Sequence, residues 1–470
     1  SGSIEIPMMQ HDQLGLLANR LGAERYQRVI AHLDATLETS SADANHGSTA
    51  CRMLAGSEFF RTLVERQIGW LEDEADLSQP TIDGLLASVN PQNLYDQDEQ
   101  GVLKSLRILR QRAMLHIVWR SFTSENGLNE TLDSMSKLAD FVIQSTVSYA
   151  EKMVSKRYGE AIGDDTGAIQ KLIVVGMGKL GGRELNLSSD IDIMFIYDEP
   201  GSTQGGRSST SNQEYFTRVA QTVIRLIDSV TVEGRVFRVD TRLRPFGDSG
   251  ALVASYPSLE NYYQQHGRDW ERYALLKARC ITGTPDQMRP FQQLAKQFVY
   301  RRYTDFGVID GLRNMKALID SERVAKGLAN DVKRGPGGIR EAEFIVQSHQ
   351  LVRGGRVPNI QKVGFKGSVE SLAAEDCLSP EVAQRLHADY RYLRQLEHGI
   401  QALRDEQTHE LPSNPSDQEA LCLLLGVDDW DALTAAMATS RSAIGSDFDA
   451  LLNDSRAQED LILGIDSDAP

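Results

Sequence analysis

The sequence predicts an α+β protein that is mostly helical, with a small mixed sheet between an N-terminal helical region and a C-terminal helical bundle. Three observations lead to this fold class. Residues 1–160 have helical patterning almost throughout, short strand-like runs occur only between about 161 and 300, and helical spacing returns after 300. We therefore expect three domains: a helical region at 1–160, a mixed core at 161–300 and a helical bundle at 301–470.

A long helix is predicted near the end of the N-terminal region, because apolar residues recur there at steps of three and four. Arg107, Arg110 and Arg112 lie around this stripe, and we expect them to form a solvated face. The stripe consists of Leu103, Leu106, Leu109, Ala113 and Ile117.

Three strands are expected in the core. LIVVG (172–176) is a short apolar strand, DIDIMFIYD (190–198) alternates, and RVFRVDTRLRP (235–245) is a third strand that Pro245 ends. The polar, glycine-rich stretch 201–213 is expected to be a mobile loop near the functional site.

The clearest helix of the bundle starts after Ser379, a capping residue followed by Pro380 in the first turn. Its apolar stripe predicts a bundle core. The stripe consists of Leu386, Tyr390, Leu393, Leu396, Ile400 and Leu403.

Composition excludes several function classes. A net charge of −16 over 470 residues argues against a nucleic-acid partner, which would need a broad basic face. The four cysteines have no metal-like spacing and are expected to be reduced thiols. No apolar run approaches the roughly 18 residues of a membrane helix, and no signal peptide is evident, so we expect a cytoplasmic protein with no membrane partner.

Gly176, Gly178 and Gly181 form a Gly-x-Gly-x-x-Gly after the first strand, and Asp198 lies where a dinucleotide-binding fold would keep its ribose-binding acid. That fold needs a crossover helix between its first two strands, which takes at least about 10–12 residues with its loops. Only residues 182–189 separate the glycines from the next strand. Dinucleotide binding is therefore excluded.

Asp190 and Asp192 suggest a different chemistry. On a strand, residues i and i+2 point to one face, and two carboxylates beside an apolar strand are costly unless a cation lies between them. Oxygen ligands of this kind suit Mg²⁺ or Mn²⁺. The third strand adds Asp240, and three carboxylates can hold the metal ions of a phosphoryl displacement. The alternation of side chains along this third strand places four of them on one face: Arg238, Asp240, Arg242 and Arg244.

Neither Asp-x-Asp nor the glycine motif is specific alone, but their order along the chain is. GMGKLGGRELNLSSDIDIMFIYDE (176–199) resembles the core of DNA polymerase β-like nucleotidyltransferases, and more narrowly that of bacterial glutamine synthetase adenylyltransferase/adenylyl-removing enzymes. One departure is Gly178-Lys179, where the superfamily usually has Gly-Ser. The strings that resemble the N-terminal, adenylyl-removing half are RLRPFGDSGALV (242–253), GRDWERYALLKAR (267–279), RRYTDFGVIDGLRNMK (301–316) and KRGPGGIREAEFIVQ (333–347).

The resemblance implies a polymerase β-like nucleotidyltransferase core with Mg²⁺ or Mn²⁺ as cofactor. The chain holds one Asp-x-Asp core, so it is similar to one half of the family's tandem enzyme. The implied reaction is phosphorolysis of adenylyl-tyrosine on glutamine synthetase, giving tyrosine and ADP. The implied partners are glutamine synthetase, the PII signalling protein or its uridylylated form, ADP or ATP, and phosphate.

The residues implied for this reaction fall into two groups. Asp190, Asp192 and Asp240 are the expected catalytic residues and metal ligands. The expected nucleotide- and phosphate-binding residues are Gly178, Lys179, Gly181, Gly182, Arg242, Arg244, Lys333 and Arg340. Two alternatives to phosphate binding stay open: Lys179 could be a solvated turn lysine, and Arg242 or Arg244 could be a structural partner of Asp240.

Two alternatives stay open at this level. The same core could transfer AMP from ATP to the synthetase tyrosine, as the other half of the family enzyme does. It could also be a signal-binding module with an idle nucleotidyltransferase fold, although three acids without a metal would then only repel one another.

Overall fold

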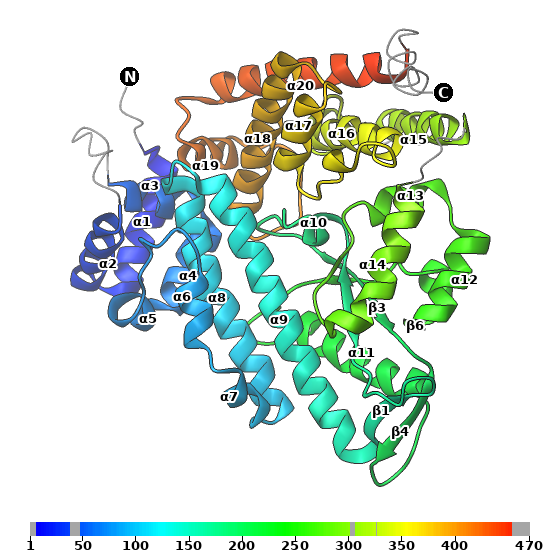
Figure 1. Ribbon diagram of the computed structural model, residues 1–470. Helices are drawn as coiled ribbons and strands as arrows, with labels where there is room; N and C mark the ends of the chain where they lie inside the picture. The colour runs from blue at the N-terminus through cyan, green and yellow to red at the C-terminus, as the bar shows by residue number, and fades with distance from the viewer. Residues whose placement is uncertain (1–5, 38–47, 301–305, 326, 454–470) are drawn as a thin grey trace.

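A small mixed sheet lies between an N-terminal layer of helices and a C-terminal helical bundle (Figure 1). The computed structural model describes residues 6–37, 48–300, 306–325 and 327–453. The predicted fold class, α+β and mostly helical, is confirmed. Residues 301–305, at the start of one of the family-like strings, lie outside the described residues.

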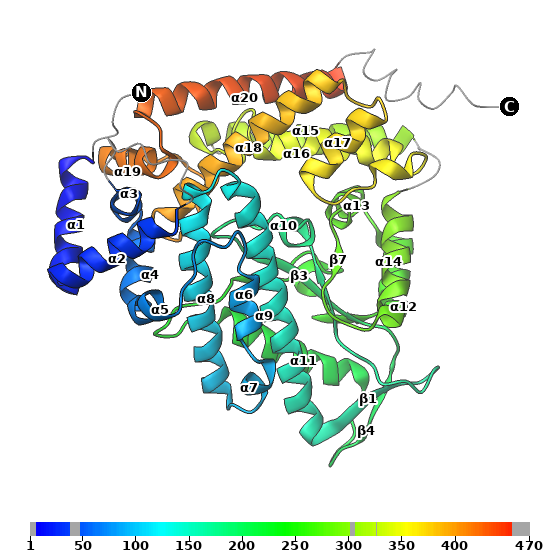
Figure 2. The same cartoon turned by 60° about the vertical axis from the view of Figure 1, so that its left-hand side comes forward.

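The N-terminal helices pack against one side of the sheet (Figures 1 and 2). α8 and α9 are the longest of them, and α9 packs along α11 of the core. The helices are α1 (Met8–Leu21), α2 (Ala23–Ala35), α3 (Thr49–Gly56), α4 (Glu58–Arg66), α5 (Ile68–Asp73), α6 (Asp83–Ser88), α7 (Pro91–Tyr95), α8 (Glu99–Thr123) and α9 (Gly127–Tyr158).

The core has the strand order β5-β3-β2-β7, with β6 also paired to β3. β2 is antiparallel to β3 and to β7, whereas β5 and β6 are parallel to β3 and share its other edge. The elements are β1 (Gly159–Gly163), β2 (Ile173–Gly176), α10 (Gly178–Gly181), β3 (Ile191–Tyr197), β4 (Gly201–Gly205), α11 (Asn212–Asp228), β5 (Val239–Asp240), β6 (Val253–Ser255), α12 (Tyr256–His266), α13 (Asp269–Leu275), β7 (Arg279–Cys280) and α14 (Pro285–Val299).

The two faces of the sheet bury side chains in two different cores. Ile193 and Phe195 of β3 pack with the N-terminal helices and α11, whereas Met194 and Ile196 pack with α12–α14 and the bundle. This separation follows from the two-residue period of a strand. Asp192 lies two residues before Met194, so its side chain is on the same face of the sheet, the one that meets the bundle.

The C-terminal bundle covers the end of the core where α10 lies, in both views (Figures 1 and 2). The predicted helix after Ser379 is confirmed: Ser379 Oγ accepts from the Val382 amide, and the predicted stripe is buried. The helices are α15 (Phe306–Ala325), α16 (Ile339–Arg353), α17 (Phe365–Ala374), α18 (Pro380–Ala402), α19 (Pro415–Leu425) and α20 (Trp430–Asn453).

Two expectations about local structure are wrong. The stretch 201–213 was expected to form a loop near the site, but it begins with β4, which pairs with β1 at the end of the core away from α10 (Figures 1 and 2). Arg107 was expected on a solvated face, but it is fully buried. Its guanidinium donates to carbonyls at the end of α11 and in the following loop, including those of Leu226 and Gly234. A helix leaves its last carbonyls unpaired, and Arg107 satisfies them from a neighbouring helix.

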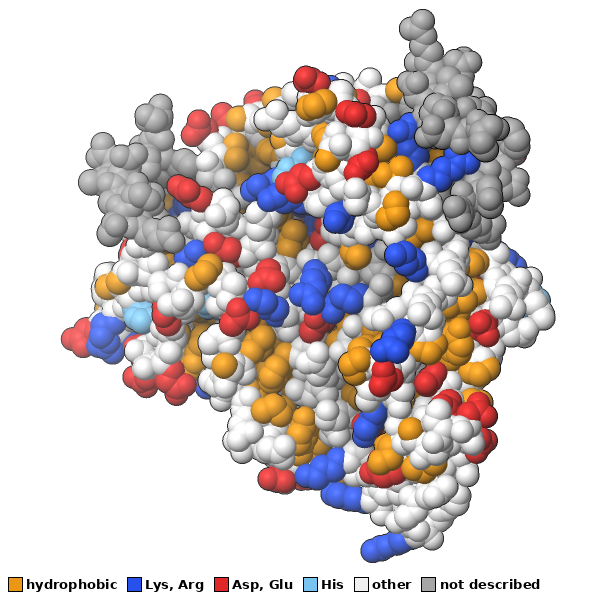
Figure 3. All heavy atoms as spheres, in the orientation of Figure 1, with side chains coloured by type: hydrophobic (Ala, Val, Ile, Leu, Met, Phe, Trp, Pro, Cys, Tyr) orange, Lys and Arg blue, Asp and Glu red, His pale blue; other side chains and the backbone are white. Residues whose placement is uncertain are grey.

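Charge is distributed without a broad basic face on the side drawn in Figure 3, where Lys and Arg occur in small groups among Asp and Glu. No helix in the described ranges is long and apolar enough to cross a bilayer.

Candidate functional site

The glycine turn between β2 and β3 brings the chain close to an acid of β3. Gly178 has φ +50°, a conformation that favours glycine, and a Cβ added there would lie 2.9 Å from Asp192 Oδ2. A Cβ on Gly181 would lie 1.9 Å from the Lys277 carbonyl oxygen. The glycines therefore allow close packing of the turn. Since β2 and β3 are antiparallel neighbours, the exclusion of a dinucleotide-binding crossover is confirmed.

Asp192 and Asp240 lie side by side on neighbouring strands. β3 and β5 run parallel, with Asp192 and Asp240 as directly paired residues. The Asp192 carboxylate makes no hydrogen bond or ion pair with any described residue. Burial, then Asp240 and Asp190, raise its pKa to about 6. Asp192 is thus a partly buried carboxylate that lies beside a second carboxylate and has no cation of its own among the described residues.

The third strand was predicted to span residues 235–245, but this length is wrong: only Val239 and Asp240 are in strand conformation. The Asp240 carboxylate accepts the Arg242 amide at 2.8 Å, a local turn that competes with the extended ladder. The Arg244 guanidinium then donates back to the Thr241 carbonyl at 2.9 Å. The predicted common face of arginines and Asp240 is therefore not formed.

The arginines of this segment neutralise two of the three acids. Arg238 Nε donates to Asp190 Oδ1 at 2.6 Å. Arg242 holds Asp240 through two nitrogens, and this guanidinium lowers the pKa of Asp240 against the opposing effect of burial. Arg242 is 71% exposed, so its head can move to another anion.

A divalent ion fits Asp192 and Asp240 better than it fits all three acids. Across the described ranges no group of three or more Asp, Glu, His or Cys is arranged to hold a metal. Asp190 is turned onto Arg238, whereas Asp192 is partly buried beside a second carboxylate and makes no ion pair with a described residue. Hard carboxylate oxygens of this kind suit Mg²⁺ or Mn²⁺. The three-acid metal site stays a prediction.

The predicted phosphate-binding cations differ in their surroundings. Arg340 forms an ion pair with Glu322 at 2.6 Å. The Lys333 ammonium has no partner among the described residues, and its charge acts to lower the pKa of Asp192. Lys333 therefore lies within electrostatic reach of the carboxylate pair, although it is distant in sequence.

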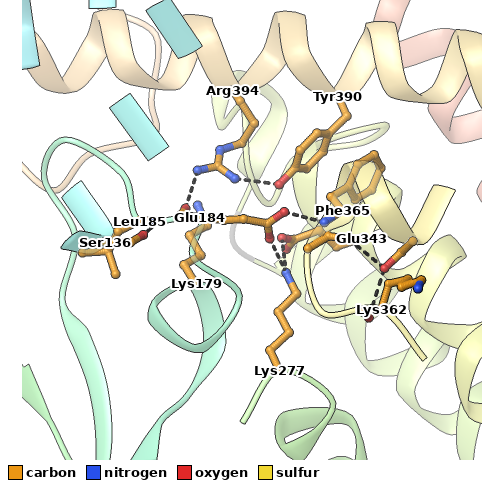
Figure 4. Close-up of polar contacts among 12 residues, drawn as sticks. Ser136, Lys179, Glu184, Leu185, Lys277, Glu343, Lys362, Phe365, Tyr390 and Arg394 are labelled. Atoms are coloured by element: carbon orange, nitrogen blue, oxygen red, sulfur yellow. Dashed lines mark hydrogen bonds and ion pairs between the residues drawn. The ribbon is translucent and has the colours of Figure 1, made fainter. Parts of the chain in front are cut away.

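Lys179 is neither solvated nor free. Its ammonium lies 3.2 Å from Glu397 Oε1 on α18 and 3.1 Å from Asn186 Oδ1, and the side chain is 12% exposed. Arg394, one turn earlier on α18, contacts Glu397 at 3.1 Å and donates to the Glu184 carbonyl at 2.7 Å. The turn is thus tied to the bundle by buried charges (Figure 4).

Sequence reasoning missed this network, which continues on the other side of the turn. Lys277 lies 3.0 Å from both Glu184 and Glu343, and all three side chains are mostly buried (Figure 4). Lys277 and Glu343 lie inside the strings that carried the family resemblance. Charged residues placed on otherwise apolar faces were the available indication, but their partners are distant in sequence.

His398 on α18 makes stability depend on pH. Burial lowers its pKa to about 3; Arg394 and Lys179 act in the same direction and Glu397 opposes them. In the unfolded chain the His398 imidazole takes up a proton near pH 6.5, whereas in the folded chain it stays neutral. The folded protein therefore keeps its full stability above pH 6.5 and loses stability as the pH falls below that value. We expect His398 to account for a loss of about 2 kcal/mol in the free energy of unfolding between pH 7 and pH 5.

Urea denaturation at both pH values measures this loss. His398→Gln, which cannot take up a proton, should show a pH difference smaller by that amount. An unchanged pH difference in the variant would show that other groups carry the dependence.

Comparison with known proteins gives two family matches. Residues 48–294, more than half of the chain, match the family model of glutamate-ammonia ligase adenylyltransferase. Residues 313–452 match the model of GlnD PII-uridylyltransferase.

Curated relatives are similar to this protein in sequence over most of the chain. Each of the following is named bifunctional glutamine synthetase adenylyltransferase/adenylyl-removing enzyme. The protein from Thioalkalivibrio sulfidiphilus is 41% identical over 84% of this chain, that from Nitrosococcus oceani 44% over 77%, and that from Pseudomonas aeruginosa 41% over 86%. The matches cover 41%, 38% and 41% of those proteins, so the chain spans about two fifths of their length.

Proposed function

Because the chain belongs to the glutamate-ammonia ligase adenylyltransferase family, we propose that it removes AMP from adenylylated glutamine synthetase by phosphorolysis. The single observation that carries the chemistry is the partly buried Asp192, which has no ion-pair partner among the described residues and lies beside Asp240 next to the glycine turn. The strings at 242–253 and 267–279 favour the removing half over its partner.

In the proposed reaction a phosphate oxygen forms a bond to the α-phosphorus as the bond from phosphorus to the tyrosine oxygen breaks. AMP thereby moves to phosphate as ADP, and the tyrosine oxygen takes up a proton. A divalent ion, when bound, would neutralise charge on the transferred phosphoryl group. Asp192 and Asp240 would hold it, with Asp190 joining them only after leaving Arg238.

The remaining residues of the site position charge. Lys333, which lacks a partner among the described residues, and the exposed Arg242 attract the incoming phosphate. The amides of Gly178 and Lys179, at the start of α10, would donate to phosphoryl oxygens, since those of Gly181 and Gly182 already donate to carbonyls of the turn. Lys179 keeps this turn in place through Glu397 rather than binding phosphate itself. Positioning and charge neutralisation then supply most of the catalysis.

A second candidate is transfer of AMP from ATP to the same tyrosine. It is favoured by one observation: the matched family model is described as an adenylyltransferase. We further propose PII or its uridylylated form as a regulatory partner, since residues 313–452 match a PII-uridylyltransferase model.

Two parallel assays separate the candidates. One supplies adenylylated glutamine synthetase with phosphate and Mg²⁺, and the other supplies unmodified synthetase with ATP and Mg²⁺. We expect ADP release in the first and no incorporation of AMP in the second. Incorporation in the second assay alone would select the transferase, and inactivity in both would leave the idle binding module.

A further inference from the structure

A cavity lies against the far end of the glycine turn. It has a volume of about 550 Å³, within the range of small-molecule pockets. Its floor is apolar and comes from α13, α14 and the residues after them. The floor includes Leu275, Leu276, Phe291, Ala295, Val299 and Tyr300.

The cavity is separate from the carboxylate pair. It borders Arg279 and Cys280 of β7, the edge strand opposite β5. β7 and β3 are separated by β2, and strands are about 4.8 Å apart, so the cavity and the acids lie on opposite sides of the turn. Burial raises the pKa of Cys280 to about 12, so its thiol stays neutral and belongs to the apolar lining.

The charged residues lining the cavity are all positive, in a protein of net charge −16. Arg279 is held by Asp140 at 2.8 and 2.9 Å. Arg183 and Lys296 are exposed at the mouth, and neither side chain has a polar partner in the ranges that the structure describes. Two uncommitted cations above an apolar floor form a site for an anion that carries an apolar body.

Arg183 also has an unusual backbone. Its φ of +55° is left-handed, which residues with a Cβ seldom adopt. Such outliers gather at ligand-binding sites, where the surroundings hold them in place. Here the Arg183 amide donates to the Leu180 carbonyl, and this conformation brings the side chain to the mouth of the cavity.

We propose that this cavity is an effector site for a nucleoside monophosphate. The ring lies on the apolar floor, the phosphate is bound by Arg183 and Lys296, and Gln292 and Gln361 of the lining contact polar atoms of the ring. Gly181 and Gly182 line the cavity, while Gly178 of the same turn packs on Asp192. The same turn therefore borders both the cavity and the carboxylates, and a ligand in the cavity would act on the carboxylates through it. The binding site itself does not depend on which reaction the carboxylates perform.

Calorimetric titration with AMP in the presence of EDTA tests the site, because metal-dependent binding at the carboxylates is then suppressed. We expect one binding event in the full chain. The double variant Arg183→Gln/Lys296→Gln should weaken it at least tenfold, and Ala295→Phe, which fills the floor, should abolish it. The matched control Arg289→Gln changes an exposed arginine on the same helix outside the cavity and should leave binding unchanged.

Other arms separate the alternatives. Asp192→Asn should retain the binding; loss there, with retention in the Arg183→Gln/Lys296→Gln variant, would place AMP at the carboxylates and overturn the proposal. Adenosine and inorganic phosphate should each bind more weakly than AMP. If phosphate alone binds as tightly as AMP, or if AMP does not bind at all, the proposed site is wrong. Unchanged thermal unfolding of each variant confirms that the loss is local.

Discussion

Replacing Asp192 with asparagine is expected to reduce the release of ADP from adenylylated glutamine synthetase by about a thousandfold or more. The carboxylate is one of the two that fit a divalent ion, and such ions contribute several kcal/mol of charge stabilisation in phosphoryl transfer. Asparagine keeps the shape of the side chain and removes its charge. Initial rates at saturating phosphate and Mg²⁺ measure the effect, and an Asp192→Asn variant of near normal activity would contradict the proposed reaction.

The same substitution should not destabilise the protein. The pKa of Asp192 is raised to about 6, above its ordinary value, so the ionised carboxylate costs stability above pH 6. This cost disappears as pH falls from 6 towards 4. In metal-free buffer at pH 7, Asp192→Asn should therefore raise the free energy of unfolding, by up to about 3 kcal/mol, and the gain should vanish near pH 4.

Asp190→Asn is the matched comparison. From the sequence alone, its charge would be expected only to repel Asp192, so that its removal would leave the melting temperature unchanged or raise it. In the structure Asp190 is bound to Arg238, and its neutralisation leaves that guanidinium without its carboxylate partner. We therefore revise the expectation to a slightly lower melting temperature for Asp190→Asn, opposite in sign to Asp192→Asn.

Replacing Glu397 with alanine is expected to lower the free energy of unfolding by about 3–5 kcal/mol, because a buried ion pair is broken from one side. Burial alone would raise the pKa of Glu397, but Lys179, His409 and Arg394 overcome it and hold the pKa well below its usual range. Glu397 and Arg394 are fully buried, so alanine leaves buried cations without their counter-charge. Urea denaturation measures the loss, provided that the slope of the free energy of unfolding against urea concentration is the same for both proteins.

Two controls separate charge from packing. Glu370 pairs with Lys366 on the surface of α17, and Glu370→Ala should cost less than about 1 kcal/mol. Lys179→Met/Glu397→Leu removes one buried cation together with the carboxylate and should recover part of the lost stability, although Arg394 still loses this partner. If that double variant is stable and fully active, the ion pair does not position the turn; if Glu397→Ala is as mild as Glu370→Ala, the network contributes little to stability.

Features that depend on near neighbours in the chain could be predicted from the amino-acid sequence. The stripe of α18 and its Ser379 cap follow from helical spacing, and the short connection after Gly181 excludes a crossover helix. The Asp-x-Asp at 190–192 and the glycine turn identified the family and led to the site prediction, because each depends on residues within about fifteen positions. The fold class followed from where strand-like and helical patterns occur.

Which charged side chains pair with one another could be seen only in the folded protein. Arg107 is buried because carbonyls of another helix converge on it, and Asp190 is neutralised by Arg238 from a different segment. The end of β5 was set by the Asp240 carboxylate turning onto the next residues, against its strand-like pattern. Periodicity reports which side of an element faces the core. Ion pairing depends on distances between segments far apart in sequence, and those distances exist only once the chain has folded.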